Sequence, residues 1–415
     1  MPSFDQIAAA LFALALAHTF ATKLFERLAH RHPRHAGLFH LLGEVEVVFG
    51  FWAIVLITVM ALVVGPAQAI EYAESRQYTE PLFVFVIMVV AASRPVLAAV
   101  DALVTRVSGW LPGRSEVARV WLCLALVPLV GSLITEPAAM TLAALMLAPL
   151  VFRPGIPERL KYGALGVLFV NISIGGTLTS FAAPPVLMVA ATWQWDSAFM
   201  FQTFGWRSAV AVVVNASVIT LLLRPHLSAP ADPPDAGQRP VPVLVSGVHL
   251  AFLALVVVFA HHPVIFLGLF LMFMGYTQAY TRHQNPLILK EALLVGFFLS
   301  GLVVLGGLQQ WWLEPIVAGL KPLALFFGAL GLTAITDNAA LTYLGSLIEG
   351  ISDQSKYMLM AGAVAGGGLT VIANAPNPAG VTLLKRGFND ESIGTVGLLL
   401  GAAGPTAMAA LMYLL

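Results

Sequence analysis

The chain has 415 residues, of which 59% are hydrophobic and only 10% are charged, and its mean hydropathy is +0.88. A soluble domain carries about 25% charged residues because its surface must face water, so this composition excludes a soluble globular protein. The formal net charge of +0 gives no basis for nucleic-acid binding, and a single cysteine excludes a disulfide framework and a cysteine-based metal site. Long apolar runs that recur along the chain instead predict an all-α polytopic membrane protein.

In chain order, the apolar runs lie near 5–22, 41–68, 81–103, 117–152, 162–192, 207–223, 242–260, 264–281, 291–308, 317–350, 358–384 and 392–415. Most of them have the length of one membrane span. The runs 117–152 and 317–350 would each form a straight helix of roughly 50 Å, which is too long for a hydrocarbon core of about 30 Å. We therefore expect each of these two runs to fold as a helical hairpin.

The distribution of Lys and Arg supports this interpretation, because cytoplasmic loops are rich in basic residues. If each hairpin leaves the membrane on the side it entered, one side collects Lys23, Arg27, Arg31, Arg34, Arg106, Arg114, Arg119, Arg153, Arg159, Lys161, Arg224, Arg239, Arg282, Lys290, Lys385 and Arg386. The other side collects only Arg76, Arg207 and Lys356. The prediction is ten transmembrane spans and two oppositely oriented hairpins, with both termini periplasmic or extracellular.

Two related octets lie at the centres of the hairpins. The first is ITEPAAMT (134–141) and the second is ITDNAALT (335–342), so Glu136 stands where Asp337 stands. The octets predict two copies of one unit inserted with opposite orientation, a common plan of secondary transporters. The first repeat is expected at 1–223 and the second at 241–415, joined by a polar cytoplasmic linker at 224–240.

A second pair of motifs follows the hairpins, GGTLTSFAAPP (175–185) and GGGLTVIANAPNP (366–378). Clustered Gly and Pro should break the helices of 162–192 and 358–384, freeing backbone carbonyls near the middle of the membrane. Such breaks are tolerated only where protein or a polar cavity receives them. We therefore expect the breaks and the hairpin turns to converge on one central site, whose oxygen ligands suit a small hard cation such as Na⁺.

These motifs resemble those of the ion transporter superfamily, which includes dicarboxylate/Na⁺ symporters, arsenite transporters and NhaD-type Na⁺/H⁺ antiporters. LITEPAAMTLAALMLAP, IGGTLTSFAAPPVLM, AITDNAALTYLGSLI and GGGLTVIANAPNPAGVTLL carry the resemblance, together with GEVEVVFGFW (43–52). Nearly the whole chain is most similar to a bacterial family of Na⁺/H⁺ antiporters. The resemblance implies inverted repeats, an elevator-type motion against a dimeric scaffold, and location in the bacterial inner membrane. Dicarboxylate symporters carry Ser-Asn-Thr at the hairpin tips, whereas the carboxylates of this chain favour cation exchange.

Glu136 and Asp337 are the strongest candidates for exchanging Na⁺ and H⁺, because ionisable groups inside a membrane are costly and usually functional. The alternative is that each carboxylate only caps a hairpin helix. Asp337 is expected to be the stronger half-site, because Pro137 replaces the ligand-capable Asn338 in the first copy. Further candidate ligands for the cation or for the broken backbone are Thr135, Asn171, Ser173, Thr177, Thr179, Thr336, Asn338, Asn374 and Asn377, with Thr370 as a secondary candidate. Glu44 and Glu46 are expected to have structural or gating roles.

The predicted function is a Na⁺/H⁺ antiporter with no cofactor, whose partners are membrane lipid, small cations and a second copy of the chain. A Na⁺- or H⁺-coupled transporter of carboxylates or oxyanions is the alternative. A remote third possibility is an intramembrane aspartyl protease, since two carboxylates could share a proton. Symmetry-related octets argue against the protease, because proteolysis does not require an inverted duplication.

Overall fold

The computed structural model of the chain describes residues 3–110, 114–227 and 240–415, apart from the side chains of Phe20, Thr22, Lys23, Glu26, Val45, Glu46, Val317, Ala318 and Asp390. Within these ranges the chain is helical and contains no β-strand. The first half contains α1 (Phe4–Phe20), α2 (Thr22–Arg31), α3 (Ala36–Gly43), α4 (Val45–Val63), α5 (Pro66–Glu74), α6 (Thr79–Ala91), α7 (Arg94–Ser108), α8 (Ser115–Leu124), α9 (Leu126–Ile134), α10 (Glu136–Leu147), α11 (Glu158–Gly175), α12 (Pro184–Trp193), α13 (Ser197–Met200) and α14 (Trp206–Leu223).

The second half contains α15 (Val243–Val258), α16 (Pro263–Ala279), α17 (Leu289–Gly306), α18 (Gln310–Ala318), α19 (Pro322–Thr333), α20 (Asn338–Ser346), α21 (Asp353–Gly366), α22 (Asn377–Leu384) and α23 (Thr395–Leu414). Short 3₁₀ turns at Gly176–Leu178 and Val371–Ala373 lie inside the two predicted breaks. Each half thus contains, in the same order, a chain reversal, an interrupted helix and a last long helix.

By length and composition, four helical segments of the described residues are long and apolar enough to cross a membrane: Glu158–Leu178, Ser197–His226, Leu289–Gly306 and Thr395–Leu414. The number rises to seven if three bent helix pairs each count as one span. Several further apolar helices are shorter, since Gly, Pro and polar residues interrupt the runs. The ten-span topology therefore stays a prediction.

Two predicted spans differ from the observed backbone. In the run 41–68, the helical segment that ends at Gly43 makes an angle of 93° with Val47–Val63. The apolar run 81–103 is divided between α6 and α7, whose axes are bent by 64°. Pro95 occupies the first turn of α7, where its missing N–H costs no hydrogen bond, and Ser93 precedes that turn in an extended conformation. Hydropathy alone does not detect this bend because the apolar run continues from α6 into α7.

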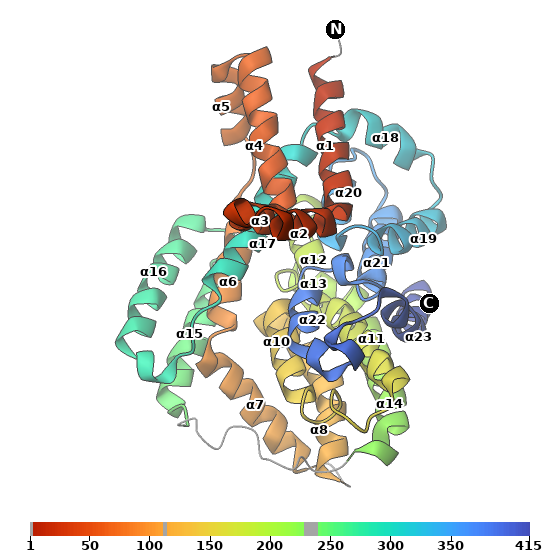
Figure 1. Cartoon of the computed structure of the whole chain (residues 1–415). Coiled ribbons are helices and arrows are strands. Elements are labelled where there is room, and N and C mark those ends of the chain that lie inside the picture. Colours follow the sequence, from red (N-terminus) through yellow and green to blue (C-terminus); the bar gives the residue numbers. More distant parts are fainter. Residues whose placement is uncertain (1–2, 111–113, 228–239) are drawn as a thin grey trace.

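The helices pack as two groups (Figure 1). In the first group, α4 packs on α1, α5 and α17, while α6 packs on α15, α16 and α17. In the second group, α11 packs on α9, α14 and α23, and α21 packs on α19. The two halves of the chain contribute to both groups, so neither half forms a compact unit by itself.

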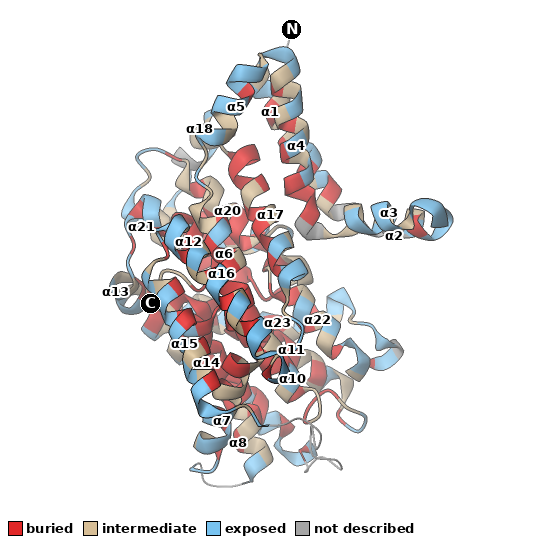
Figure 2. Ribbon diagram, turned by 90° about the vertical axis from the view of Figure 1, so that its left-hand side faces the viewer, coloured by how far each residue is buried: buried red, intermediate tan, exposed pale blue. Residues whose placement is uncertain are grey.

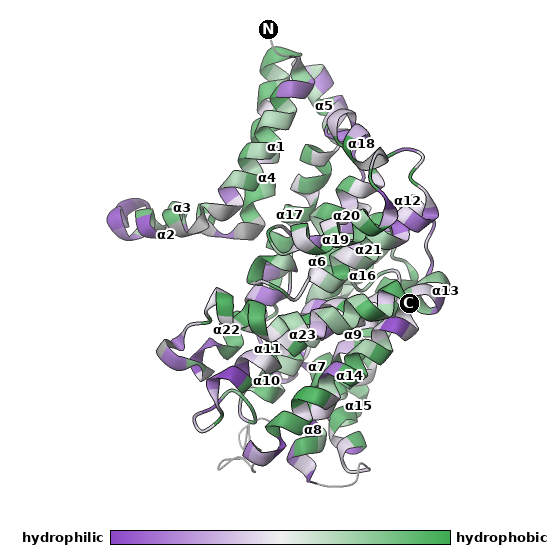
Figure 3. Ribbon diagram, turned by 90° about the vertical axis from the view of Figure 1, so that its right-hand side faces the viewer, coloured by the Kyte–Doolittle hydropathy of each residue, from purple (hydrophilic) through white to green (hydrophobic). Residues whose placement is uncertain are grey.

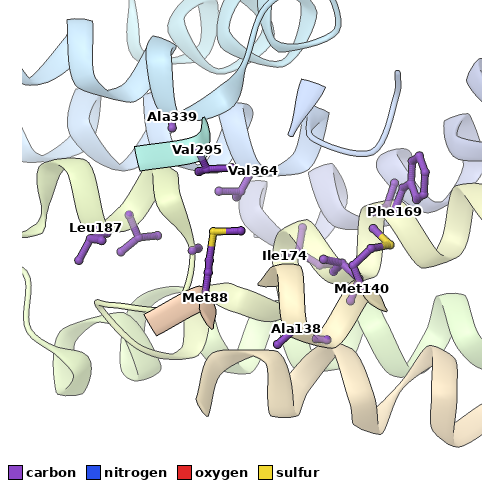
Figure 4. Close-up of a cluster of buried hydrophobic side chains, with 14 of the residues drawn as sticks. Met88, Ala138, Met140, Phe169, Ile174, Leu187, Val295, Ala339 and Val364 are labelled. Atoms are coloured by element: carbon purple, nitrogen blue, oxygen red, sulfur yellow. The ribbon is translucent and has the colours of Figure 1, made fainter. Parts of the chain in front are cut away.

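Crossed contacts join the two halves inside the second group. The helix after the first break, α12, packs on α20 of the second hairpin, and the helix after the second break, α22, packs on α10 of the first hairpin. Buried residues concentrate where these helices meet, while the outward faces of α4, α14 and α16 expose apolar side chains (Figures 2 and 3). One apolar cluster connects α6, α10, α11, α12, α17, α20 and α21 (Figure 4). The helices that flank the breaks and the hairpin turns therefore share one packed core.

Candidate functional site

The tip of the first hairpin brings a carboxylate into the core. Thr135 joins α9 to α10 with φ 79° and ψ 151°, a conformation that is strained for a β-branched residue. Glu136 follows as the first residue of α10, and Pro137 occupies the next position, where it has no N–H to satisfy. The Glu136 side chain is 0% exposed. A strained turn thus presents a fully buried acidic group.

The two oxygens of Glu136 have different surroundings. Oε2 accepts a hydrogen bond of 2.8 Å from Nδ2 of Asn374, which belongs to the break of the second half. Oε1 is buried and has no hydrogen-bond partner. The carboxylate also packs against the backbone of Gly176 in the first break, where an added Cβ would lie 2.5 Å from Oε1. A buried carboxylate oxygen left unpaired is costly, so this position is suited to receive a proton or a cation.

Other buried oxygens share this property. The hairpin tips and the second break contain buried side-chain oxygens without a hydrogen-bond partner, namely Thr135 Oγ1, Glu136 Oε1, Thr333 Oγ1, Asn338 Oδ1, Asn374 Oδ1 and Asn377 Oδ1. Hydroxyl, amide and carboxylate oxygens of this kind are ligands for hard cations. In the described ranges, no three His, Cys, Asp or Glu side chains lie close enough to hold a metal. The donors available are therefore one buried carboxylate and neutral oxygens.

Asp337 has a different environment from its counterpart. It is the N-cap of α20, and its Oδ1 accepts hydrogen bonds from the backbone N–H groups of Ala339 (2.8 Å) and Ala340 (3.2 Å). The residue is half-buried and lies within electrostatic reach of Glu136. This geometry matches the capping role that the sequence offered as the alternative for both acids.

The equivalent threonines of the two Gly-Gly-x-Leu-Thr motifs fasten each break to the hairpin of its own half. Thr179 donates to the carbonyl of Ser132 (2.7 Å), and Thr370 donates to the carbonyl of Ala334 (2.9 Å). Their hydroxyls satisfy backbone carbonyls near the hairpin turns, which would otherwise be unpaired in an apolar environment. These two threonines therefore hold each break against the hairpin of the same half.

Side-chain hydrogen bonds join the two halves in this region. Besides the Glu136–Asn374 bond, Thr342 donates to the carbonyl of Pro185 (2.9 Å), and Asn338 Nδ2 approaches Ser173 Oγ at 3.5 Å. Ser173 itself donates to the carbonyl of Val364. The predicted convergence of residues from both halves is thus present for these side chains.

Asn377 belongs to the same region. Its Nδ2 donates to the carbonyls of Gly367 (2.8 Å) and Thr370 (2.9 Å), which the second break exposes. This holds the interrupted backbone and leaves Oδ1 unpartnered.

Several predicted site residues make structural hydrogen bonds within or between helices. Asn171 donates to the carbonyls of Leu124 and Val212, and so satisfies the bend between α8 and α9. Thr177 donates to the carbonyl of Ile174 and contacts Ser208, and Thr336 donates to Leu332 one turn earlier in the chain.

Glu44 does not join the site either. Glu44 forms an ion pair of 3.0 Å with Lys290, which connects the start of α4 to the start of α17. The side chain of Glu46 lies outside the described residues. The ion pair of Glu44 agrees with a structural role.

Sequence reasoning missed two hydroxyls at the hairpin tips. Ser132 and Thr333 both stand two residues before their octets. Ser132 donates to the carbonyl of Gly175 and accepts from the N–H of Leu178, while the Thr333 hydroxyl is buried without a partner. Extending the comparison of the octets by two residues would have found this pair.

Comparisons with known proteins relate the chain to a family and to a solved structure. A family model described as "Putative Na+/H+ antiporter" matches residues 3–415, while no curated protein matches the sequence. The crystal structure of the Alcanivorax borkumensis YdaH transporter, described as having an unusual topology, is similar with a TM-score of 0.45 and 14% sequence identity, over 89% of this chain and 96% of that chain. The family model covers almost the entire chain, so the chain belongs to this Na⁺/H⁺ antiporter family and is a membrane transporter rather than an enzyme.

Proposed function

We propose that the chain exchanges Na⁺ for H⁺ and that Glu136 is the group for which the two ions compete. The observation that carries this proposal is the buried, unpartnered Oε1 of Glu136, whose chain neighbour Thr135 and hydrogen-bond partner Asn374 also have unpartnered oxygens. Burial disfavours an ionised carboxylate that has no counter-charge, so Oε1 must take up either a proton or a cation. Competitive exchange requires a binding position that holds either H⁺ or Na⁺ but not both.

The neutral oxygens give the site its preference for a small cation. When the proton leaves Glu136, the negative carboxylate and the free oxygens of Thr135 and Asn374 can replace the hydration shell of Na⁺. Asn374 keeps its Nδ2 hydrogen bond to Oε2 in either state, which holds the carboxylate in position. Because Asn374 comes from the second half, cation binding also links the two halves.

We also propose that residues 1–223 and 241–415 are inverted repeats of one unit. The same order of hairpin, broken helix and long helix in each half supports this, as do the equivalent bonds from Thr179 and Thr370 to their hairpins. Asn338, Asn377 and Thr333, each with a buried free oxygen, are the candidates for a second half-site near Asp337. Inverted repeats with ion sites at broken helices are typical of secondary transporters.

The short hairpin arms support a site inside the membrane. The second arms, α10 and α20, have 12 and 9 residues, or about 18 Å and 14 Å at 1.5 Å per residue. Neither length crosses a hydrocarbon core of about 30 Å, so hairpins that enter from one surface end within it.

The division into two helix groups is the arrangement that an elevator motion needs. The helices with the hairpins and breaks (α9–α12 and α19–α23) would move against a scaffold of α1, α4, α6 and α15–α17, which pairs with a second copy of the chain. The protein would work in the bacterial inner membrane.

The test is exchange by purified protein in proteoliposomes, followed as Na⁺-driven proton flux. Glu136→Gln should abolish the flux, because an amide can neither release a proton nor balance the charge of Na⁺. Asp337→Asn is the matched control, since Asn also caps helices well and should retain exchange. Full exchange in Glu136→Gln would overturn the proposal. If Asp337→Asn lost exchange and Glu136→Gln retained it, Asp337 would be the stronger half-site, as the sequence predicted.

A second candidate function, coupled transport of an anion, is favoured by one specific observation. A cavity of about 330 Å³ lies between the two helix groups and is lined by Arg76 together with Glu80, Tyr343 and Ser346. The Arg76 guanidinium bonds the Ser75 hydroxyl and forms no ion pair with a described carboxylate. Uptake of a labelled carboxylate that depends on Arg76, without Na⁺-driven proton flux, would decide for this alternative.

A further inference from the structure

We propose that the helical arm formed by α2 and α3 is an interfacial binding element for anionic phospholipid headgroups. This arm, residues 22–43, lies outside the ion site, and none of the contacts described for that site involves it. The two helices pack on each other and project away from the body of the protein (Figures 2 and 3).

The direction of the arm follows from its connections. The segment Pro33–Gly43 makes an angle of 93° with Val47–Val63, so the arm is perpendicular to α4. If α4 crosses the membrane, the arm must therefore run parallel to the membrane surface. The length of α4 also fits a position of the arm at one membrane surface. Its 19 residues measure about 28 Å, which is close to the thickness of the hydrocarbon core, so α4 can reach from the arm to the opposite surface.

The base of the arm is fixed rather than loosely attached. His18 at the end of α1 contacts the carbonyl of Leu42 in α3 through Nε2 (2.9 Å) and accepts a hydrogen bond from Trp52 Nε1 in α4 through Nδ1 (3.1 Å). The His18 ring also packs on Phe25 of α2. One side chain thus connects both helices of the arm to both helices from which the arm departs.

The arm exposes apolar side chains. Leu24, Leu38 and Leu41 are 54%, 55% and 43% exposed, although each lies in an amphipathic or apolar helix. In water these exposed leucines would be unfavourable, whereas at a membrane boundary they insert between lipid chains. The occupant of this face is therefore lipid.

The charges of the arm select the type of lipid. Arg27, Arg31 and Arg34 are exposed, and none of them forms an ion pair with a described side chain. Lys23 adds a fourth positive charge in the sequence of the arm, and Glu26 is its only acidic residue. Basic residues beside a membrane surface attract anionic headgroups, each strengthening the attraction about fivefold.

The first experiment locates the arm. Spin labels are placed by Leu38→Cys and by Leu41→Cys in a Cys123→Ala background of the full chain, which is then reconstituted in phosphatidylglycerol vesicles. The expected result is high accessibility of both labels to oxygen and low accessibility to a water-soluble nickel chelate. The label at Arg31→Cys should show the reverse preference. Equal access of the chelate to all three labels would place the arm in water and overturn the proposal.

The second experiment tests selectivity. The thermal unfolding midpoint of the detergent-solubilised protein is measured during titration with phosphatidylglycerol or phosphatidylcholine at one ionic strength. Stabilisation by phosphatidylglycerol alone is expected, and Arg27→Gln with Arg31→Gln and Arg34→Gln should raise the half-saturating concentration by about fivefold per removed charge.

The matched control removes three exposed basic residues of the same predicted side, Arg159→Gln with Lys385→Gln and Arg386→Gln. This variant should leave the half-saturating concentration within about twofold of the parent value, because more distant charges are screened. An equal effect of both triple variants, or stabilisation by phosphatidylcholine as strong as that by phosphatidylglycerol, would contradict a site on the arm.

Discussion

The two acidic residues of the repeated octets are not equivalent. Glu136 is fully buried with one oxygen free, whereas Asp337 is half-buried and caps α20. The sequence comparison favoured Asp337, because Asn338 offers a ligand where the first copy has Pro137. A sequence pattern does not reveal which oxygens the backbone will already satisfy. The N-cap position of Asp337 uses its Oδ1 for two N–H groups, while the strained Thr135 turn places Glu136 in the core.

The close contact between Gly176 and Glu136 yields a prediction at this scale. In Gly176→Ala, the new Cβ would lie 2.5 Å from Oε1 and 3.0 Å from Cδ of Glu136, so the carboxylate must move away from Asn374. Because the displaced group is the end of a flexible side chain, the fold should persist. We expect the apparent KM for Na⁺ to rise roughly tenfold or more, equivalent to about 1.4 kcal/mol of lost binding free energy.

The measurement for Gly176→Ala is Na⁺-driven proton flux over a range of Na⁺ concentrations, together with the thermal unfolding midpoint. Gly268→Ala is the control, since nothing lies within 4 Å of its added Cβ. An unchanged KM in Gly176→Ala would mean that the position of Glu136 does not control cation binding.

Glycines allow the long helices of the core to approach one another closely. An added Cβ on Gly166 of α11 would lie 2.3 Å from the carbonyl carbon of Gly401 in α23, and one on Gly301 of α17 would lie 2.3 Å from the backbone of Gly50 in α4. Small residues at such crossings let helix backbones pack directly, which is the main source of helix association in lipid. The first crossing holds α11, the helix before the first break, and the second joins two helices of the first group.

A prediction follows for the crossing of α11 and α23. Gly166→Ala should lower the free energy of unfolding by about 1–3 kcal/mol, because backbone atoms, unlike a flexible side chain, cannot move aside without separating the helices. The measurement is the thermal unfolding midpoint of the purified protein in detergent. Gly268→Ala should leave the midpoint unchanged or raise it slightly, since alanine is the better helix former. Equal midpoints for the two variants would refute the role of the crossing.

In the molecule as a whole, the two halves of the chain are joined by packing that neither half could form alone. The contacts of α12 with α20 and of α22 with α10, together with the Glu136–Asn374 hydrogen bond, require both halves. A site that is divided in this way can change its accessibility when the halves or the helix groups shift, which is how alternating access works in transporters with repeats.

The predicted topology can be tested directly on the whole chain. Because basic residues collect on one side, alkaline phosphatase fused after Leu415 should be active, and green fluorescent protein at the same position should not fluoresce. Both reporters should give the opposite result when inserted in the linker at 224–240. Activity of the phosphatase in the linker would require an inverted orientation and a different reading of both hairpins.

The class of the protein and the positions of its interrupted helices could be predicted from residue types and their order along the chain. Composition required a membrane protein, hydropathy and length required hairpins near 117–152 and 317–350, and Gly and Pro located both helix breaks. These properties are local, because they depend on residue type and on the hydrogen bonds of neighbouring backbone groups.

Which of the candidate polar groups lie in contact became evident from the three-dimensional packing. Asn374 bonds Glu136 across 238 residues of sequence, Asn171 instead supports the bend between α8 and α9, and Asp337 caps its own helix. The bend between α6 and α7 and the direction of the α2–α3 arm also appeared only there. The physical reason is that the cost of a buried polar atom depends on the partners that packing brings to it, and those partners come from distant parts of the chain.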